Sequence, residues 1–208
     1  MKNFITPQEK FWAGNFGIDY IARNCGNNLL ASNLDFFTKS LHRAGEINSC
    51  IEFGANIGMN ISAIKLLYPD IEVHGIEINN EASIRLAEVI PANQIYNQSI
   101  LDFLPTRQWD LALVKTVLIH IDPNYLHSVY EKLVSSTSRY LLVAEYYSQN
   151  PIEVSYRGYS DRLFKRDFTG EILDAYPEMQ LIDYGFAYRR DPKYPQDDIT
   201  WFLMEKVS

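Results

Sequence analysis

The chain has 208 residues, of which 47% are hydrophobic and 22% are charged, and its formal net charge is -7. This composition is typical of one globular domain with a real core, and it excludes a mostly disordered chain. The acidic balance argues against sequence-independent binding of duplex nucleic acid, which requires a basic face. We therefore expect a small-molecule partner.

The first 14 residues lack the apolar core of a signal peptide, and no run of about 18 apolar residues predicts a membrane span. We expect a cytoplasmic protein that does not contact a membrane. Cys25 and Cys50 have neither CxxC spacing nor a secretory context, so we expect buried, reduced thiols rather than a disulfide. We also find no compact spacing of acids or histidines that would predict a metal site.

From Thr6 to Gly45, apolar residues recur at spacings of three to five, which predicts helices. We expect residues 1–45 to form a helical extension or lid in front of the main domain. Ser32 or Asn33 is the expected cap of the second helix.

Beyond Gly45 the pattern changes to short apolar strands that alternate with amphipathic helices. The expected strands span residues 49–54, 72–77, 94–100, 110–115, 139–147, 180–190 and 199–207, and the expected helices span residues 58–69, 80–91 and 124–136. This alternation predicts a parallel sheet with helices on both faces, so residues 46–208 form a Rossmann-like, doubly wound α/β domain of about seven strands. Because "DPKYPQDD" is too short for a crossover helix, the last strand should be antiparallel.

The stretch "IEFGANIGMN", residues 51–60, follows the first expected strand. In a doubly wound sheet the ligand lies beyond the carboxyl ends of the strands, and glycine lets it approach the main chain. The spacing Gly54-x-Asn56-x-Gly58 lacks two glycines of the dinucleotide fingerprint G-x-G-x-x-G, since Asn56 and Met59 occupy their positions. Asn56 tolerates a left-handed backbone better than most residues. A glycine turn made only for packing is the alternative.

Glu77 ends the second expected strand, where a carboxylate accepts hydrogen bonds from both ribose hydroxyls of an adenosine ligand. Nicotinamide cofactors and S-adenosylmethionine both fit such an acid. The loop at residues 54–58 favours S-adenosylmethionine, because its spacing is close to the G-x-G-x-G pattern of class I methyltransferases. A surface acid without a ligand is the alternative interpretation of Glu77.

These residues carry a resemblance. The sequence resembles class I S-adenosylmethionine-dependent methyltransferases, and more narrowly the pseudaminic acid biosynthesis-associated methylases. The narrower resemblance covers nearly the whole chain, through "TPQEKFWAGNFG", "EFGANIG", "SILDF", "VLIHI", "AEYY", "SYRGYSDRLFKRDF" and "PQDDITWFL". It implies S-adenosylmethionine as the cofactor.

The resemblance also implies where the cofactor binds. The methionine part matches the loop after the first strand, the ribose matches Glu77, and the adenine lies between Ile78 and the pair Ser99 and Ile100. An aspartate is common in the family where this chain has Ser99, and Asp102 is expected to turn outward. The predicted cofactor-binding residues are Glu52, Gly54, Ala55, Asn56, Gly58, Glu77, Ile78, Ser99, Ile100, Lys115 and Trp12.

Trp12 and Tyr20 in the extension are predicted to cover the cofactor and exclude water, or else to be ordinary core residues. Methyl transfer requires an acceptor lone pair behind the sulfonium carbon, and a general base assists when the acceptor is a hydroxyl or a protonated amine. His120, after the fourth strand, is the first candidate base, unless it only closes the start of a helix. Tyr146, after the fifth strand, is the second predicted catalytic residue.

Residues 145–168, "EYYSQNPIEVSYRGYSDRLFKRDF", are aromatic and basic, and we expect a loop that borders the acceptor. Its tyrosines would stack on a sugar or base, and its basic side chains would bind phosphate or carboxylate. The alternative is a solvated helix face in which the arginines pair with nearby acids. The predicted substrate-binding residues are Tyr147, Tyr156, Arg157, Arg162 and Arg166.

We therefore expect a methyltransferase that acts on an oxygen or nitrogen of a small acceptor in glycan biosynthesis. A basic segment within an acidic chain favours an anionic or nucleotide-linked sugar. Two alternatives stay open: a nicotinamide-dependent oxidoreductase, and a non-catalytic scaffold protein that keeps the cofactor fold.

Overall fold

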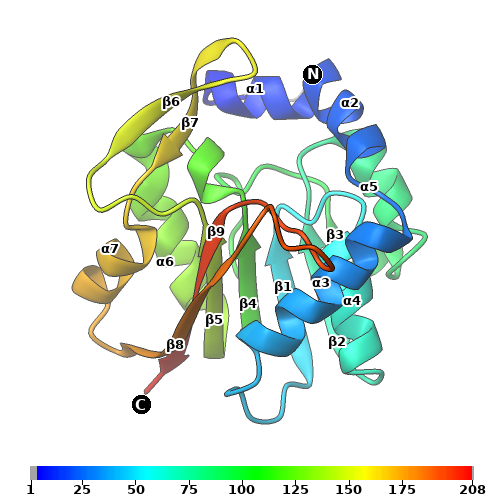
Figure 1. The fold of residues 1–208 in the computed structure, drawn as a ribbon, viewed down its shortest axis with the longest axis vertical. Helices are drawn as coiled ribbons and strands as arrows, with labels where there is room; N and C mark the ends of the chain where they lie inside the picture. Colours follow the sequence, from blue (N-terminus) through cyan, green and yellow to red (C-terminus); the bar gives the residue numbers. More distant parts are fainter. Residues whose placement is uncertain (1–3, 208) are drawn as a thin grey trace.

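A computed structural model of the protein describes residues 4–207, so residues 1–3 of the predicted extension and residue 208 of the predicted main domain lie outside it. Its centre is a seven-stranded sheet with the strand order β3-β2-β1-β4-β5-β9-β8 (Figure 1). The strands are β1 Ser49–Phe53, β2 Glu72–Ile76, β3 Ile95–Tyr96, β4 Trp109–Lys115, β5 Thr137–Glu145, β8 Met179–Ala187 and β9 Ile199–Lys206.

The predicted α/β sheet with an antiparallel last strand is confirmed. Strands β1 to β5 run parallel, and β9 is antiparallel to both of its neighbours, β5 and β8. The edge strand on this side of the sheet is therefore β8, because β9 lies between β8 and β5, and β3 forms the opposite edge. The third strand covers only Ile95–Tyr96, which is shorter than the predicted range of 94–100.

Helices cover both faces of this sheet. One face packs on α3 (Asn27–Ser40), α4 (Met59–Leu67) and α5 (Asn80–Leu86), and the other on α6 (Leu126–Ser136) and α7 (Phe168–Ala175). Successive residues of a strand face opposite layers, so Ile51 and Phe53 lie on the α6–α7 side and Cys50 on the α3–α4 side. Because both faces are buried, the strands are almost continuously apolar.

The N-terminal helices differ from the prediction in their caps. Helices α1 (Pro7–Ala13) and α2 (Asn15–Arg23) precede α3, which has Gly26 at its N-cap, so Ser32 and Asn33 lie inside α3. The predicted cap is wrong because α3 begins several residues earlier and buries both side chains. Cys50 is buried as predicted, whereas Cys25 is exposed, contrary to the prediction, between α2 and α3.

The predicted loop at residues 145–168 contains a β-hairpin, and the helix-face alternative is also wrong. Strands β6 (Ile152–Tyr156) and β7 (Tyr159–Lys165) pair antiparallel. They are joined by Arg157 and Gly158, whose φ angles are +51° and +87°. Two-residue turns with positive φ at both positions match the twist of the flanking strands, which explains the hairpin.

Helix α1 and the hairpin lie side by side across the carboxyl ends of the sheet strands (Figure 1). Gln8 Nε2 donates to the Asp161 carbonyl at 3.0 Å, and the rings of Phe11 and Tyr159 are 5.1 Å apart. We refer to α1, α2 and the β6–β7 hairpin together as the roof. The predicted division of the chain at residue 45 stays a prediction.

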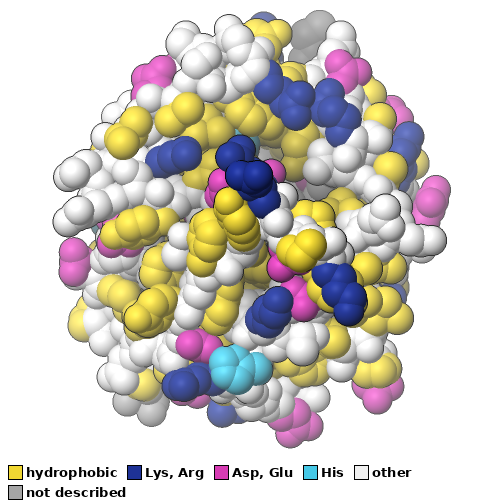
Figure 2. Space-filling view, viewed as in Figure 1, with side chains coloured by type: hydrophobic (Ala, Val, Ile, Leu, Met, Phe, Trp, Pro, Cys, Tyr) yellow, Lys and Arg dark blue, Asp and Glu magenta, His cyan; other side chains and the backbone are white. Residues whose placement is uncertain are grey.

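Short 3-10 helices η1 (Ala92–Gln94), η2 (Leu118–His120) and η3 (Pro123–Tyr125) complete the described elements. The edge strand β8 exposes Leu181, Tyr184 and Phe186, and hydrophobic side chains gather on this part of the surface in Figure 2. None of the helices within residues 4–207 combines the length and hydropathy that crossing a bilayer requires.

Gly54, in the loop after β1, and Gly158, in the hairpin turn, have similar φ angles but different surroundings, so the pair tests how tightly the loop is packed. Gly54 and Gly158 have φ of +81° and +87°, but a Cβ at Gly54 would lie 2.6 Å from Val117 Cγ2, whereas one at Gly158 would meet nothing within 4 Å. We expect Gly158→Ala to destabilise the fold by about 1 kcal/mol through backbone strain alone. Gly54→Ala should cost roughly 2 to 4 kcal/mol, because overpacking adds to the strain. Urea unfolding measures both, and equal losses would contradict this packing.

Candidate active site

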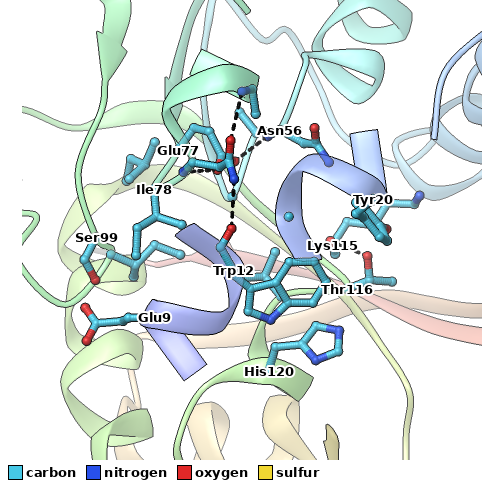
Figure 3. A pocket seen from close by; sticks show the side chains of 18 of the residues that line it. Glu9, Trp12, Tyr20, Asn56, Glu77, Ile78, Ser99, Lys115, Thr116 and His120 are labelled. Atoms are coloured by element: carbon cyan, nitrogen blue, oxygen red, sulfur yellow. Dashed lines mark hydrogen bonds between the residues drawn. The ribbon is translucent and has the colours of Figure 1, made fainter. Parts of the chain in front are cut away.

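A cavity of about 190 Å³ lies beneath the roof, at the carboxyl ends of β1, β2 and β4 (Figure 3). Its walls come from residues 54–57, 59–60, 76–79, 98–101, 115–117 and 120–122, together with residues of α1, α2 and α3. The chain proceeds outward from β1 to β2 and β3 on one side, and to β4 and β5 on the other. This reversal of strand order leaves a crevice, which is where open α/β sheets bind ligands.

The loop after β1 is bent by three residues in the left-handed region. Gly54 and Gly58 have φ of +81°, and Asn56 has φ of +48°, as its tolerance of this region predicts. The amides of Gly54 and Ala55 both donate to the Ile76 carbonyl at 2.9 Å. The loop is thereby fastened to the end of β2.

Glu77 fixes the same loop from its other side. Its Oε2 accepts from the Asn56 amide at 2.8 Å and its Oε1 from the Asn79 amide at 2.6 Å (Figure 3). The side chain is buried and lines the cavity.

Asn79 connects Glu77 to the roof, a role that the sequence analysis missed. Its Oδ1 caps α5 by accepting from the amides of residues 81 and 82, at 3.0 and 3.2 Å. Its Nδ2 donates to the carbonyls of Trp12 and Gly14 at 3.0 and 3.3 Å. An asparagine before a helix signals a cap, but nothing in the pattern indicates the contact with the roof.

An acidic and a basic side chain, Glu52 and Lys115, lie at the ends of β1 and β4. Glu52 Oε1 accepts from Asn60 Nδ2 at 2.6 Å, its buried Oε2 has no partner among the described residues, and burial raises its pKa to about 8. Lys115 Nζ donates to Gln196 Oε1 at 3.1 Å. Burial lowers the pKa of Lys115 to about 8, although the Glu52 carboxylate opposes this shift. Lys115 and Asn60 line the cavity, whereas Glu52 lies behind Asn60.

His120 lies in η2, buried beneath the roof. Its Nδ1 is 2.6 Å from the Arg162 carbonyl, which can only accept, so Nδ1 carries the proton and Nε2 is left as an acceptor. Its ring centroid is 4.6 Å from that of Trp12 and 5.0 Å from that of Tyr156. Burial lowers the pKa of His120 to about 4, with the bond to the carbonyl opposing the shift. The imidazole is therefore neutral near pH 7.

Glu145, at the end of β5, holds the segment that carries His120. Its Oε1 accepts from the amides of Val117 and Leu118 at 2.9 and 2.8 Å, and burial raises its pKa to about 8. The sequence analysis missed this residue. The signal that identified Glu77, an acid at the carboxyl end of a strand, also applies to Glu145.

One wall of the cavity is formed by Ile78, Ser99 and Ile100. Ser99 Oγ accepts from the Leu101 amide at 3.0 Å. Asp102 is exposed, as expected. Trp12 closes the cavity from α1, and its buried Nε1 has no hydrogen-bond partner among residues 4–207.

The cavity brings together most of the predicted cofactor residues but none of the predicted substrate residues. Tyr146 donates to Asp197 Oδ2 at 2.8 Å, outside the cavity wall. Tyr147 and Arg166 border a separate small depression beside Phe168. The predicted residues that line the cavity are Trp12, Gly54, Ala55, Asn56, Glu77, Ile78, Ser99, Ile100, Lys115 and His120. The predicted residues that do not line it are Glu52, Gly58, Tyr146, Tyr147, Tyr156, Arg157, Arg162 and Arg166.

The basic side chains of the hairpin region are partly engaged with acids. Arg162 pairs with Asp161 at 2.7 Å, and Arg166 pairs with Glu171 at 2.6 Å, as the alternative of paired arginines predicts. Arg157, at the hairpin turn, lies with its guanidinium 5.9 Å from the centre of the Tyr156 ring. Within the described part of the chain, no three His, Cys, Asp or Glu side chains group closely enough to hold a metal ion.

No family model matches the sequence, and no curated protein matches it. Among solved structures, the chain is similar to 1,6-didemethyltoxoflavin-N1-methyltransferase of Burkholderia thailandensis, crystallised with 1,6-didemethyltoxoflavin and S-adenosylhomocysteine. Those two share 12% identity at a TM-score of 0.68, over 100% of this chain and 93% of that one.

Two further structures show the same fold. Magnesium protoporphyrin IX methyltransferase (ChlM) from Synechocystis PCC 6803, with bound SAM, shares 12% identity at a TM-score of 0.66, over 99% of this chain and 100% of that one. N-methyltransferase NodS from Bradyrhizobium japonicum WM9, in complex with S-adenosylhomocysteine, shares 13% sequence identity with this chain at a TM-score of 0.63. The match covers 91% of this chain and 98% of that one. The chain therefore has the class I methyltransferase fold.

The burial of neutral His120 makes stability depend on pH. Its pKa is lowered from an unfolded value near 6.5 to about 4, so its contribution is present above pH 6.5 and is lost as pH falls towards 4. His120→Asn keeps a donor for the Arg162 carbonyl but removes the titration. Between pH 7 and 4, the wild type should lose about 3 kcal/mol more unfolding free energy than the variant. Parallel pH profiles from chemical unfolding would contradict a neutral, buried His120.

Proposed function

We propose that this protein is an S-adenosylmethionine-dependent methyltransferase that acts on a small sugar-related acceptor. One observation carries the proposal: a buried carboxylate, Glu77, faces the cavity at the end of β2 and holds the bent loop after β1. The class I methyltransferase fold supports it, as do the similar structures that contain SAM or S-adenosylhomocysteine.

The residues around the cavity fit this cofactor. Glu77 would accept from the ribose hydroxyls, and Ile78, Ser99 and Ile100 would flank the adenine. Glu52 and Lys115 are buried near the methionine loop, and their ionised forms would complement the ammonium and the carboxylate of the ligand. A bound ammonium would favour the carboxylate form of Glu52, whose pKa of about 8 leaves it largely protonated near pH 7 in the free protein. The unpartnered Glu52 Oε2 and Asn56 Oδ1 are consistent with a polar ligand here.

When bound, S-adenosylmethionine would supply a methyl group on its sulfonium, which passes to the acceptor nucleophile as S-adenosylhomocysteine leaves. His120 Nε2 would accept the proton that leaves the acceptor, while the Arg162 carbonyl holds the tautomer. A base with a pKa of about 4 is weak, so positioning carries more of the rate, up to about 7 to 11 kcal/mol in favourable cases. Trp12, stacked near His120, would exclude water.

The acceptor would enter from the side of the hairpin. Tyr156 lies next to His120, and Arg157 offers a cation at the hairpin turn. Tyr146, the second predicted catalytic residue, would contact the acceptor on this side through its hydroxyl, which donates a hydrogen bond to Asp197. Tyr147, Arg162 and Arg166 would contribute only by breaking their present contacts. The resemblance to pseudaminic acid biosynthesis-associated methylases supports an anionic or nucleotide-linked sugar, methylated on oxygen or nitrogen.

Cofactor binding tests the proposal. Glu77→Gln cannot give both backbone amides an oxygen, so it should weaken S-adenosylhomocysteine binding roughly 10- to 150-fold, the effect of losing one hydrogen bond to a charged group. Glu72→Gln, at the exposed start of the same strand, is the matched control and should leave affinity unchanged. Isothermal titration calorimetry measures both.

Two results would contradict the proposal. One is a wild-type protein that binds NADH but not S-adenosylhomocysteine, which would favour the oxidoreductase. The other is a Glu77→Gln variant that binds S-adenosylhomocysteine as tightly as the wild type, which would place the nucleoside elsewhere.

A further inference from the structure

Helix α1 places a carboxylate in the cavity that the proposed function does not yet use. Thr6 and Glu9 form a capping box, in which Glu9 Oε2 accepts from the amides of Ile5 and Thr6, both at 2.7 Å. The other oxygen, Oε1, is buried and has no hydrogen-bond partner among the described residues. The side chain is only 7% exposed. Capping therefore explains one oxygen of Glu9 and leaves the second without a structural role.

This oxygen belongs to one particular end of the cavity. Glu9 lines the cavity together with Ser99, and Figure 3 shows Glu9, Ser99 and Ile78 at the end away from Lys115. Gln8, from the same helix, also lines the cavity with a buried, unpartnered acceptor, Oε1. Among the lining side chains within residues 4–207, Lys115 is the single Lys or Arg. This end therefore offers acceptors and lacks cations, so it suits a ligand group that donates hydrogen bonds.

Adenine carries such a group, because its 6-amino substituent is a donor at the edge of the ring. Ile78, Ser99 and Ile100 are the residues proposed to flank the adenine, and they share this end with Glu9. Ser99 offers only an uncharged hydroxyl, and one of the two lone pairs of its Oγ already accepts from the Leu101 amide at 3.0 Å. The roof thus supplies a carboxylate, which the lining residues of the loop after β3, residues 98–101, do not.

We propose that Glu9 Oε1 accepts a hydrogen bond from the adenine 6-amino group, which makes Glu9 a specificity-determining residue for the cofactor. The inference rests on the proposed function. A base with a 6-oxo group would place an acceptor against the carboxylate, so hypoxanthine would be rejected. Because Glu9 sits on α1, base selection also requires the roof to be in place.

The variant Glu9→Gln keeps the oxygen that caps α1 and replaces the oxygen that faces the cavity. Glutamine also completes a capping box, with its Oε1 on the amides of Ile5 and Thr6. Its Nε2 then takes the position of the Glu9 oxygen in the cavity and becomes a donor there. A donor suits a 6-oxo group better than a 6-amino group, so the preference should be lost or reversed.

The experiment compares S-adenosylhomocysteine with its 6-oxo analogue, S-inosylhomocysteine, by calorimetry on the full chain. The wild type should prefer the adenine compound by about tenfold to a hundredfold, the range for a hydrogen bond to a charged group. Glu9→Gln should bring this ratio to one or below. Thr6→Ala is the control: it removes the side-chain cap but keeps the carboxylate, so the ratio should stay at its wild-type value.

The possible results distinguish a failure of the Glu9 assignment from a failure of the proposed function. A Glu9→Gln variant that keeps the wild-type ratio overturns the assignment of Glu9 and leaves the methyltransferase proposal intact. A wild-type protein that binds both compounds equally overturns it in the same way. If the wild type binds neither compound, the proposed function fails, and the role of Glu9 fails with it.

Discussion

The site depends on one carboxylate that joins three segments of the chain. Glu77 accepts from the amide of Asn56, in the loop after β1, and from the amide of Asn79, at the start of α5. Asn79 then holds the carbonyls of Trp12 and Gly14 in the roof. The group proposed to bind the ribose thus also sets the shape of the loop below it and the position of the helices above it, so binding and architecture are coupled through one side chain.

Buried polar atoms without partners are uncommon in folded proteins, because each costs about 1 to 3 kcal/mol of desolvation. Several of them belong to residues that line this cavity: Gln8 Oε1, Glu9 Oε1, Trp12 Nε1 and Asn56 Oδ1. A further one, Glu52 Oε2, belongs to a side chain that contacts the lining residue Asn60. Glu52 and Lys115 add an acid and a base whose pKa values both shift to about 8 through burial. A polar ligand bound in the cavity would supply the missing partners. Part of the desolvation free energy of ligand binding is therefore already present in the free protein.

The fold was largely predictable because strand and helix periodicities differ and because the short "DPKYPQDD" connection forces an antiparallel last strand. Asn56 was predictable as well, since few residues tolerate φ of +48°. The hairpin at residues 152–165 was not, because Arg157-Gly158 is a weak turn signal beside Asn-Gly. Contacts between distant segments, such as Asn79 with the roof or Gln196 with Lys115, leave no periodic pattern and emerge only from packing. Glu9 is visible in the sequence as part of a capping box, but its second oxygen acquires meaning only in the cavity.

The most direct test of the account is a crystal structure of the protein with S-adenosylhomocysteine. Both ribose hydroxyls should lie within hydrogen-bond distance of the Glu77 carboxylate, with the adenine beside Ile78 and the amino acid part near Gly54. A nucleoside bound outside the cavity, or one whose ribose does not touch Glu77, would contradict it.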